Sequence, residues 1–233
     1  MSGYQPPTPD EVRAIAQVYY LQRQVRAEAV ERPTMVLVGG QTGAGKSSAA
    51  KLVRAELRQA GGFVHVDADR LRERINLRGE SPTSEETQAT AGALAGALRS
   101  IAMDGRRHLL EEGTFRSAVT LEGFVKRIQA AGYRVELVAV ATPFEESCLG
   151  IYQRFEAQHA QGNANPRFIS DRYHDESALG FAVTVDALAS RFDRVRVVNR
   201  AGEVYFDSQA AGRHPSAIDA LKAGQAIDTV LLQ

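Results

Sequence analysis

Short, mostly apolar runs alternate along the chain with longer segments that have a helical pattern. Residues 34–39 (TMVLVG) form the clearest run, and further runs cover residues 63–66, 108–112, 134–141 and 195–199. Continuous apolar runs of this length are typical of strands buried on both faces of a parallel sheet. The sequence therefore predicts an α/β fold, with a parallel sheet of about five strands flanked by helices.

Both ends of the chain carry further predicted elements. Thr8 and Glu11 have the spacing of a capping box, with Pro9 at the first helical position, so a helix is predicted from there to about Ala29. Residues 200–202 (RAG) predict a turn, after which residues 203–207 (EVYFD) return as a C-terminal hairpin strand. We expect residues 1–32 to form an N-terminal tail and helix, and residues 33–233 to form one domain.

Composition and charge narrow the class of protein. The 233 residues include 28 Lys and Arg and 28 Asp and Glu, and this balance argues against a nucleic-acid-binding protein. The single cysteine, Cys148, cannot form an internal disulfide, which suits a reducing compartment. No apolar run approaches the ~20 residues of a membrane span, and the N-terminus lacks the pattern of a signal peptide. We therefore expect a cytoplasmic protein that binds neither membranes nor nucleic acid.

Residues 40–47 (GQTGAGKS) match the phosphate-binding pattern G-x-x-x-x-G-K-[ST] between a predicted strand and a predicted helix. The glycines allow backbone N–H groups to turn toward a phosphate, and the helix N-terminus favours negative charge. Lys46 is expected to reach the β- and γ-phosphates, and Ser47 to bind Mg²⁺. The residues of this P-loop segment predicted to bind a nucleoside triphosphate are Gly40, Gln41, Thr42, Gly43, Ala44, Gly45, Lys46, Ser47 and Ser48.

The second and third runs distinguish between kinds of P-loop protein. The chain contains no guanine-reading N-K-x-D motif, which argues against a GTPase, whereas Glu111 and Glu112 could imitate the Walker B element of an ATPase motor. The second run ends at Asp67 and Asp69, where strand ends of an open α/β sheet border the ligand crevice. Asp69 suits the general base of a small-molecule kinase, with a helix cap as the alternative. For Asp67, a cap and a role near Mg²⁺ are equally open.

Arginines after the fourth run suit the stabilisation of a phosphoryl group in transfer. Arg154, Arg167 and Arg172 lie where P-loop kinases place their lid, although a single arginine is more often a solvated surface residue. His174 follows two of these arginines and is predicted to cap or brace a helix. Cys148 is predicted to lie in a helix and to contribute only to packing.

Seven segments along the chain form an ordered set of motifs. They are GGQTGAGKSS (39–48), DAD (67–69), EEGTFR (111–116), AAGYRVELVAVATP (130–143), LGIYQRFE (149–156), R-x6-H-D (167–175) and VRVVNRAGEVYFDS (195–208). In these motifs and their order, the chain resembles the zeta toxin family of P-loop kinases over roughly residues 33–208. The combination of EGT-x-R with a downstream R-[FY]-E is far more specific than the P-loop alone.

The resemblance implies a fold like that of polynucleotide kinases and an ATP- and Mg²⁺-dependent activity. The expected reaction transfers the γ-phosphate of ATP to a UDP-activated amino sugar, typically to the 3′-hydroxyl of UDP-N-acetylglucosamine. Lys46 and Ser47 would hold the phosphates and Mg²⁺, and Asp69 would be the general base. Further implied roles are acceptor orientation for Glu112, Thr114 and Arg116, a phosphate clamp for Arg154 and Arg167, and proximity to adenine for Asn199 and Arg200.

Two positions on the acceptor side depart from the family pattern. The segment before the third run reads AGALAGALRS where well-known members carry a carboxylate, and Phe124 stands where they offer a hydroxyl. Relatives of this fold phosphorylate other hydroxyls, including those of NAD or an antibiotic, so such a compound or another sugar is an open alternative. An ATP-hydrolysing binding module is the alternative of a different class. The resemblance also implies a proteinaceous antitoxin, for which the N-terminal helix alone is too short.

Overall fold

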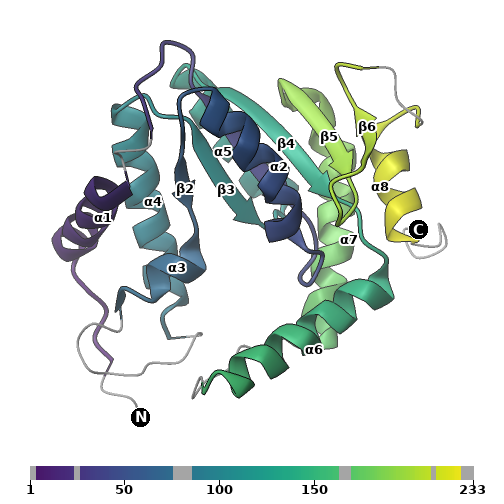
Figure 1. The fold of residues 1–233 in the computed structure, drawn as a ribbon, viewed down its shortest axis with the longest axis horizontal. Coiled ribbons are helices and arrows are strands. Elements are labelled where there is room, and N and C mark those ends of the chain that lie inside the picture. The colour runs from purple at the N-terminus through teal and green to yellow at the C-terminus, as the bar shows by residue number, and fades with distance from the viewer. Residues whose placement is uncertain (1–3, 24–26, 76–85, 163–168, 211–213, 227–233) are drawn as a thin grey trace. The chain divides into compact units, whose positions relative to one another are not determined.

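The computed structural model describes residues 4–23, 27–75, 86–162, 169–210 and 214–226, and Figure 1 labels its elements. These residues belong to two compact units, each of which is described here on its own. The first comprises Met1–Pro33 and Leu57–Glu111, and the second comprises Thr34–Glu56 and Glu112–Gln233.

The N-terminal helix α1 (Pro9–Arg23) begins with the predicted capping box. The backbone N–H of Thr8 donates to Glu11 Oε2 at 2.8 Å, and the backbone N–H of Glu11 donates to the Thr8 hydroxyl at 3.3 Å. These two bonds satisfy backbone donors that an isolated helix start leaves open. The predicted continuation to Ala29 is wrong, because Ala27 takes part in an isolated β-bridge.

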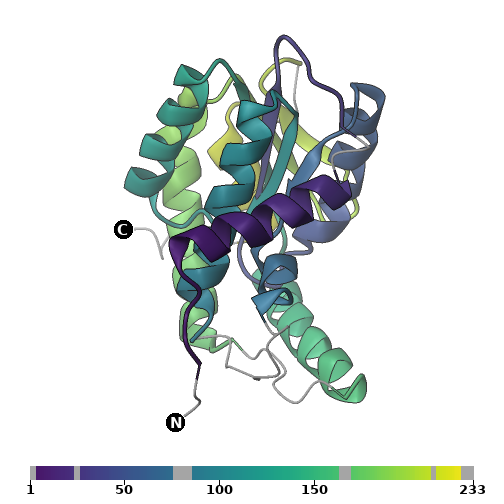
Figure 2. The same cartoon turned by 90° about the vertical axis from the view of Figure 1, so that its left-hand side faces the viewer.

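The rest of the first unit is built around one long helix. Its elements are β2 (Val64–Val66), α3 (Ala68–Arg72), α4 (Gln88–Asp104) and the first part of β3 (Leu109–Gly113). β2 and β3 pair in parallel, with Val64 opposite Leu109. α4 packs against α1, α3 and β2 through buried residues such as Leu94 and Leu98, and Figure 2 shows α1 lying across it. The sequence SPTSEE (81–86) predicts that this helix starts at Ser81, a position that lies outside the described residues.

The second unit contains the remaining strands, paired in the order β1, β4, β5 and β6. Their bounds are Thr34–Gly39, Arg134–Val140, Arg194–Val198 and Val204–Asp207. β1 pairs in parallel with β4, β4 pairs in parallel with β5, and β5 pairs antiparallel with β6. The predicted α/β class, with parallel strands followed by a C-terminal hairpin, is therefore confirmed, and the predicted strand ends are correct to within a residue or two.

The second unit also contains several helices. They are most of α2 (Lys46–Gln59), α5 (Ala118–Ala130), α6 (Phe144–Ala160), α7 (Asp171–Leu188), a 3₁₀ turn (Ala189–Arg191) and α8 (Ala217–Gln225). α5 packs on β4, α8 packs on β5 and β6, and α7 contacts α5 and α8. Fully buried Phe181, Leu137 and Val197 lie in the resulting core.

The C-terminal helix α8 was not predicted from the sequence. Its N-terminus is capped by Ser216, whose hydroxyl oxygen accepts from the backbone N–H of Asp219 at 3.2 Å. The same hydroxyl donates to the Asp219 carboxylate at 2.6 Å. Ala220 and Leu221 are fully buried, and α8 packs against β5 and β6. Figure 1 shows α8 beside these two strands.

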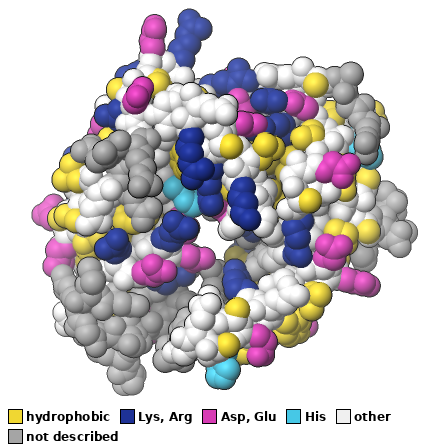
Figure 3. Space-filling model, in the orientation of Figure 1, with side chains coloured by type: hydrophobic (Ala, Val, Ile, Leu, Met, Phe, Trp, Pro, Cys, Tyr) yellow, Lys and Arg dark blue, Asp and Glu magenta, His cyan; other side chains and the backbone are white. Residues whose placement is uncertain are grey.

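Helix length and surface charge are the features that bear on membranes and on nucleic acid. None of the helices in the described ranges combines the length and apolar character that crossing a bilayer requires. Acidic and basic side chains are both spread over the face shown in Figure 3, as the balanced composition suggests.

Candidate functional site

The phosphate-binding loop joins the buried strand β1 to the start of α2. Gly43 and Gly45 adopt φ angles of 78° and 81°, a left-handed conformation that favours glycine. A Cβ atom at Gly43 would lie 1.9 Å from the backbone oxygen of Ser147, so this position also leaves no space for a side chain. Lys46 Nζ donates to the carbonyl oxygens of Gly40 and Gln41, both at 2.9 Å. The ammonium group therefore lies against the backbone of the loop.

A carboxylate lies beside the hydroxyl of Ser47. Ser47 Oγ donates to Glu112 Oε2 at 2.9 Å, and Arg54 Nη2 donates to Glu112 Oε1 at 2.9 Å. Glu112 is 13% exposed and Arg54 is 20% exposed, so the ion pair is largely shielded from water. The structure thus brings Glu112 beside the hydroxyl of Ser47. The Walker B interpretation and the acceptor-orienting role of Glu112 both stay predictions.

Other contacts fix the loop backbone from outside. The backbone N–H of Thr42 donates to Ser177 Oγ at 3.3 Å. Thr142 Oγ1 donates to the carbonyl oxygen of Ala44 at 2.7 Å. Gln41, which the sequence suggested as a nucleotide ligand, has a fully buried side chain. Its backbone oxygen accepts from Lys46, and its side chain bonds to residues beyond the loop.

The predicted residues Asn199 and Arg200 lie in the turn between β5 and β6. Asn199 Oδ1 accepts from the backbone N–H groups of Ala201 and Glu203, at 3.0 and 2.9 Å, so this side chain holds the turn together. Arg200 Nη2 donates to the carbonyl oxygen of Gly43 at 2.6 Å. Arg200 therefore links the hairpin to the phosphate-binding loop.

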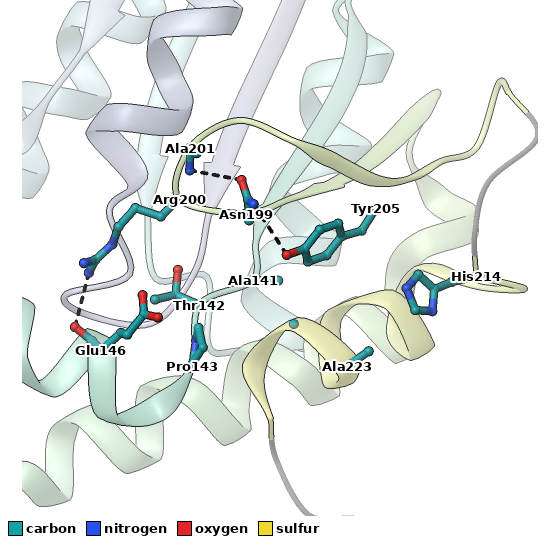
Figure 4. Close-up of a pocket in the computed structure, with 11 residues that line it drawn as sticks. Ala141, Thr142, Pro143, Glu146, Asn199, Arg200, Ala201, Tyr205, His214 and Ala223 are labelled. Atoms are coloured by element: carbon teal, nitrogen blue, oxygen red, sulfur yellow. Dashed lines mark hydrogen bonds between the residues drawn. The ribbon is translucent and has the colours of Figure 1, made fainter.

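An open cavity of about 710 Å³ lies beside this link (Figure 4). It is lined by Ala141, Thr142, Pro143, Glu146, Asn199, Arg200, Ala201, Tyr205, His214, Ala223 and Gly224. In Figure 4, Arg200 extends toward the start of α6, whereas Asn199 points toward Tyr205, to whose hydroxyl it donates at 3.4 Å. The volume is that of a small-molecule pocket, and its aromatic and amide lining suits a flat heterocycle.

The EGTFR segment places its arginine on an exposed surface. Arg116 Nη1 donates to Glu176 Oε2 at 3.3 Å, and its guanidinium carbon lies 4.7 Å from the centre of the Tyr173 ring. A hydrogen bond from Arg172, together with the charges of Arg172 and Arg116, lowers the pKa of Glu176. The neighbouring Phe115 has a φ angle of 43°, unusual for a bulky residue. Arg116 is thus held by charge and by an aromatic face, with much of its side chain open to water.

The segment after β2 holds the two predicted aspartates in the first unit. Asp67 Oδ1 accepts from the backbone N–H groups of Asp69 and Arg70, at 3.1 and 3.2 Å, and so caps α3. The alternative of a cap is therefore correct for Asp67 and wrong for Asp69. The Asp69 carboxylate is 57% exposed and forms an ion pair with Arg72 at 2.6 Å.

The remaining sequence candidates separate into three groups. Arg154 lies in the middle of α6 and is partly buried, whereas Arg167 lies outside the described residues. Arg172 begins α7 with a side chain that is 89% exposed. His174 is fully buried and lies 2.7 Å from Ser147 Oγ, which confirms the prediction of a brace. Burial raises the pKa of the Cys148 thiol, in agreement with its predicted packing role.

Sequence reasoning missed several residues that form the site. They are Ser147, Ser177, Tyr205, His214 and Gln225. Serines and glutamines are common on helix surfaces, so their residue type gives no signal. Tyr205 lies within a motif that had been identified, and its position on the hairpin next to Asn199 could have marked it.

The chain is similar in sequence to toxins of known family. A profile of the zeta toxin family matches residues 19–210. Toxin zeta of Enterococcus hirae is 26% identical over 190 residues, which cover 78% of this chain and 65% of that protein. Toxin PezT of Streptococcus pneumoniae serotype 4 is 27% identical over 188 residues, covering 77% of this chain and 73% of that protein. The chain thus spans slightly less than two thirds of the length of the Enterococcus toxin.

Solved structures share the fold. One from the PezAT chromosomal toxin–antitoxin system of Streptococcus pneumoniae superposes with a TM-score of 0.78 and 23% identity, over 97% of this chain and 93% of that chain. A structure of AvrRxo1-ORF1:AvrRxo1-ORF2 with sulphate ions has a TM-score of 0.61 and 15% identity, over 96% and 81% of the two chains. A structure of AvrRxo1-ORF1:-ORF2 with ATP has a TM-score of 0.58 and 15% identity, over 82% and 60%.

Proposed function

The chain belongs to the zeta toxin family, and on that basis we propose that it is a kinase that transfers the γ-phosphate of ATP to a hydroxyl of a nucleotide sugar. The observation that carries the proposal is the group formed by Lys46 and Ser47 at the phosphate-binding loop and Glu112 of β3, whose carboxylate accepts from the Ser47 hydroxyl. It combines a cation for the phosphates with a hydroxyl and a carboxylate suited to a metal. ATP is the donor that fits this loop.

The cavity beside the loop supports a nucleoside as the rest of the donor. Its volume of about 710 Å³ lies within the range of roughly 300–1,000 Å³ usual for ligand pockets. Tyr205 offers an aromatic face, and Arg200 bridges the cavity wall to Gly43 in the loop. We propose that the base and ribose of ATP occupy this cavity while the phosphates follow the loop.

The oxygen groups beside the loop fit Mg²⁺. Mg²⁺ prefers hard oxygen ligands and usually keeps several waters, so it needs only one or two protein groups. Ser47 would bind the ion directly, and Glu112 would bind it or orient its waters, with Arg54 balancing the carboxylate charge. When bound, the ion neutralises charge on the β- and γ-phosphates.

The chain's own side chains would carry the proton and the developing charge. The Asp69 carboxylate would accept the proton of the acceptor hydroxyl while the oxygen of that hydroxyl forms a bond to the γ-phosphorus. The bond from this phosphorus to the bridging oxygen breaks, and its electron pair leaves with ADP. Lys46, Arg154 and Arg167 would stabilise the equatorial oxygens of the moving phosphoryl group.

Two features bear on the identity of the acceptor. Arg116, held by Glu176 and Tyr173, presents a guanidinium suited to a diphosphate. Thr114, two positions earlier, is only partly buried and would add a hydroxyl for a sugar. We propose UDP-N-acetylglucosamine, phosphorylated at its 3′-hydroxyl, as the substrate, because the chain carries the EGT-x-R motif that the family associates with acceptor binding.

An acceptor screen tests this proposal. The whole chain is incubated with ATP, Mg²⁺ and one of UDP-N-acetylglucosamine, UDP-N-acetylmuramic acid derivatives, NAD or free sugars, and the products are identified by mass. A phosphorylated UDP-sugar is the expected result. Product from NAD or a free sugar alone would keep the kinase and replace the substrate, whereas ATP hydrolysis without any phosphorylated acceptor would favour a binding module.

The relatives also suggest a partner. One structural neighbour comes from a system described as toxin and antitoxin, and we propose that a proteinaceous antitoxin restrains this chain as well. Induced expression should arrest growth, and the Lys46→Ala variant should not. An adjacent gene product that restores growth and binds the purified chain would be the antitoxin. Normal growth with active kinase would instead indicate that the chain is not toxic.

A further inference from the structure

The side chain of Gln41 is fully buried and all its polar atoms have partners beyond the phosphate-binding loop. Its Nε2 group donates to the carbonyl oxygen of Thr142 at 2.8 Å and to Ser147 Oγ at 3.2 Å. Its Oε1 atom accepts from Gln225 Nε2 at 2.7 Å. Since the Thr142 carbonyl can only accept, the orientation of the Gln41 amide is fixed, and Gln225 must be the donor to it.

The hydroxyl of Ser147 extends these bonds to α7. Ser147 Oγ donates its only hydrogen to the carbonyl oxygen of Phe144 at 2.8 Å. Its lone pairs therefore accept from Gln41 Nε2 and from His174 Nε2, the latter at 2.7 Å. His174 must carry a hydrogen on Nε2, and its fully buried ring packs edge-on against Phe144 with centroids 4.4 Å apart.

Further contacts hold the next two residues of the loop. Ser177 Oγ accepts from the backbone N–H of Thr42 and donates to the carbonyl oxygen of His174 at 2.8 Å. The backbone oxygen of Ser147 lies against Gly43. Residues 41–43 are thus each contacted by a residue of α6, α7 or α8. The polar atoms that make these contacts are buried, so removing one of them would leave its partner without a hydrogen bond.

We propose that His174 and Gln225 are positioning residues for the phosphate grip. Both act through Gln41, His174 by way of Ser147 and Gln225 directly, and they hold the loop backbone in the conformation that receives phosphates. The inference rests on the proposed nucleotide binding at this loop. It assigns part of the phosphate affinity to two buried side chains that touch no phosphate themselves, one of them in the C-terminal helix.

The effect should depend on the phosphates of the ligand. Because the hydrogen bonds hold residues 41–43, their loss should lower the affinity for ligands whose phosphates bind the loop. The affinity for a ligand without phosphates should stay the same. A residue that only stabilised the fold would change the melting temperature and leave the ratio of ATP to adenosine affinity unaltered. That ratio is therefore the readout that separates positioning from stability.

The test measures Kd for ATP and ADP by calorimetry, and for adenosine by ligand-observed NMR, with the whole chain. His174→Leu, which removes the donor, should weaken ATP and ADP roughly tenfold and leave adenosine unchanged. His174→Gln, which keeps an amide donor, should restore most of this loss. Gln225→Leu reaches Gln41 from α8 and provides a second test if His174→Leu does not fold.

Thr184→Val is the matched control. Thr184 lies fully buried in α7, the helix that carries His174. Its hydroxyl donates to the carbonyl oxygen of Gly180 at 2.8 Å and not to the loop. Its replacement should leave all three affinities unchanged. Equal losses for adenosine and ATP, or unchanged ATP affinity in both Leu variants, would overturn the inference alone. Absence of ATP and ADP binding by the unsubstituted chain would overturn the proposed function together with it.

Discussion

The residues around the phosphate-binding loop and those expected to hold the acceptor are fixed in different ways. The loop is fixed by buried groups, among them Gln41 and Thr142, which are at most 1% exposed. On the acceptor side, Asp69 in the first unit and Arg116 in the second are 57% and 43% exposed, and each is held by ion pairs.

This difference separates a preorganised half of the proposed reaction from an adaptable one. Breaking a buried hydrogen bond costs about 1–3 kcal/mol, because the remaining partner loses its hydrogen bond and stays away from water. An ion pair exposed on both sides contributes about 0–1 kcal/mol, so Arg116 can exchange Glu176 for substrate at little cost. The Asp69 carboxylate is open to substrate, although its partner Arg72 is only 13% exposed. We infer that the site for ATP is already formed before ATP binds, whereas the side chains on the acceptor side rearrange when the acceptor binds.

The largest effect is expected from Lys46→Ala. This change removes the cation at the transferred phosphate, and phosphoryl transfer should fall roughly a thousandfold or more. The measurement is the initial rate of ADP formation with acceptor present. Lys51→Ala, an exposed lysine in the same helix, should retain normal activity. A Lys46→Ala variant with full activity would show that the reaction occurs elsewhere.

Asp69→Asn tests the acceptor half next. Loss of a general base should lower kcat by roughly a hundredfold to a thousandfold while the Kd of ATP stays the same. Asp104→Asn, an exposed aspartate at the end of α4, is the control. If Asp69→Asn instead weakened ATP binding and left kcat unchanged, Asp69 would belong with the residues that bind ATP. The contrast between the loop and the acceptor side would then be wrong.

Arg116→Ala should produce a smaller change, in KM for the acceptor. We expect this KM to rise about tenfold, because one charged hydrogen-bonding partner is lost, with little change in the KM of ATP. Arg127→Ala, an exposed arginine of α5, serves as the control in the same steady-state assay. A rise confined to the KM of ATP would place Arg116 with the donor and contradict the proposed role.

The smallest effects are expected from two glycines in helices. A Cβ atom at Gly92 in α4 would meet open space, so Gly92→Ala should raise the free energy of unfolding by about 0.5–1 kcal/mol. At Gly150 in α6 it would lie 2.7 Å from the carbonyl oxygen of Gly43, so Gly150→Ala should lower stability by about 1 kcal/mol. Chemical denaturation compares the two variants, and equal changes would show that the loop region is not tightly packed.

Periodicity and turn residues predicted much of the fold. The strand at residues 34–39 and the capping box of Thr8 and Glu11 were correct because their signals are local. At the phosphate-binding loop, glycine spacing predicted the left-handed backbone of Gly43 and Gly45, whereas the contacts that hold the loop come from distant residues. The predicted extension of the N-terminal helix to Ala29 is wrong because Ala27 forms an isolated bridge with Gly62, and the sequence around Ala27 does not indicate this distant contact.

Some partnerships between distant residues were out of reach of the sequence. The end of the third run indicated that Glu111 or Glu112 could lie near the phosphate-binding loop, and Glu112 does bond to Ser47. Nothing indicated that Gln225 bonds to Gln41 across 184 positions, since Gln is usually solvated. The short helix α8 was missed although Ser216 and Asp219 have the spacing of a capping box. A helix this short depends mainly on its packing against β5 and β6, which the sequence does not display.

The close approach of Ser147 to Gly43 also ties α6 to the phosphate-binding loop. The first turn of this helix lies against the loop, while Arg154 follows Ser147 by seven residues, or roughly 10 Å along the helix axis. A side chain at position 43 would therefore displace the helix that carries Arg154 as well as the loop, so this one glycine couples the shape of the loop to the position of a predicted phosphate clamp.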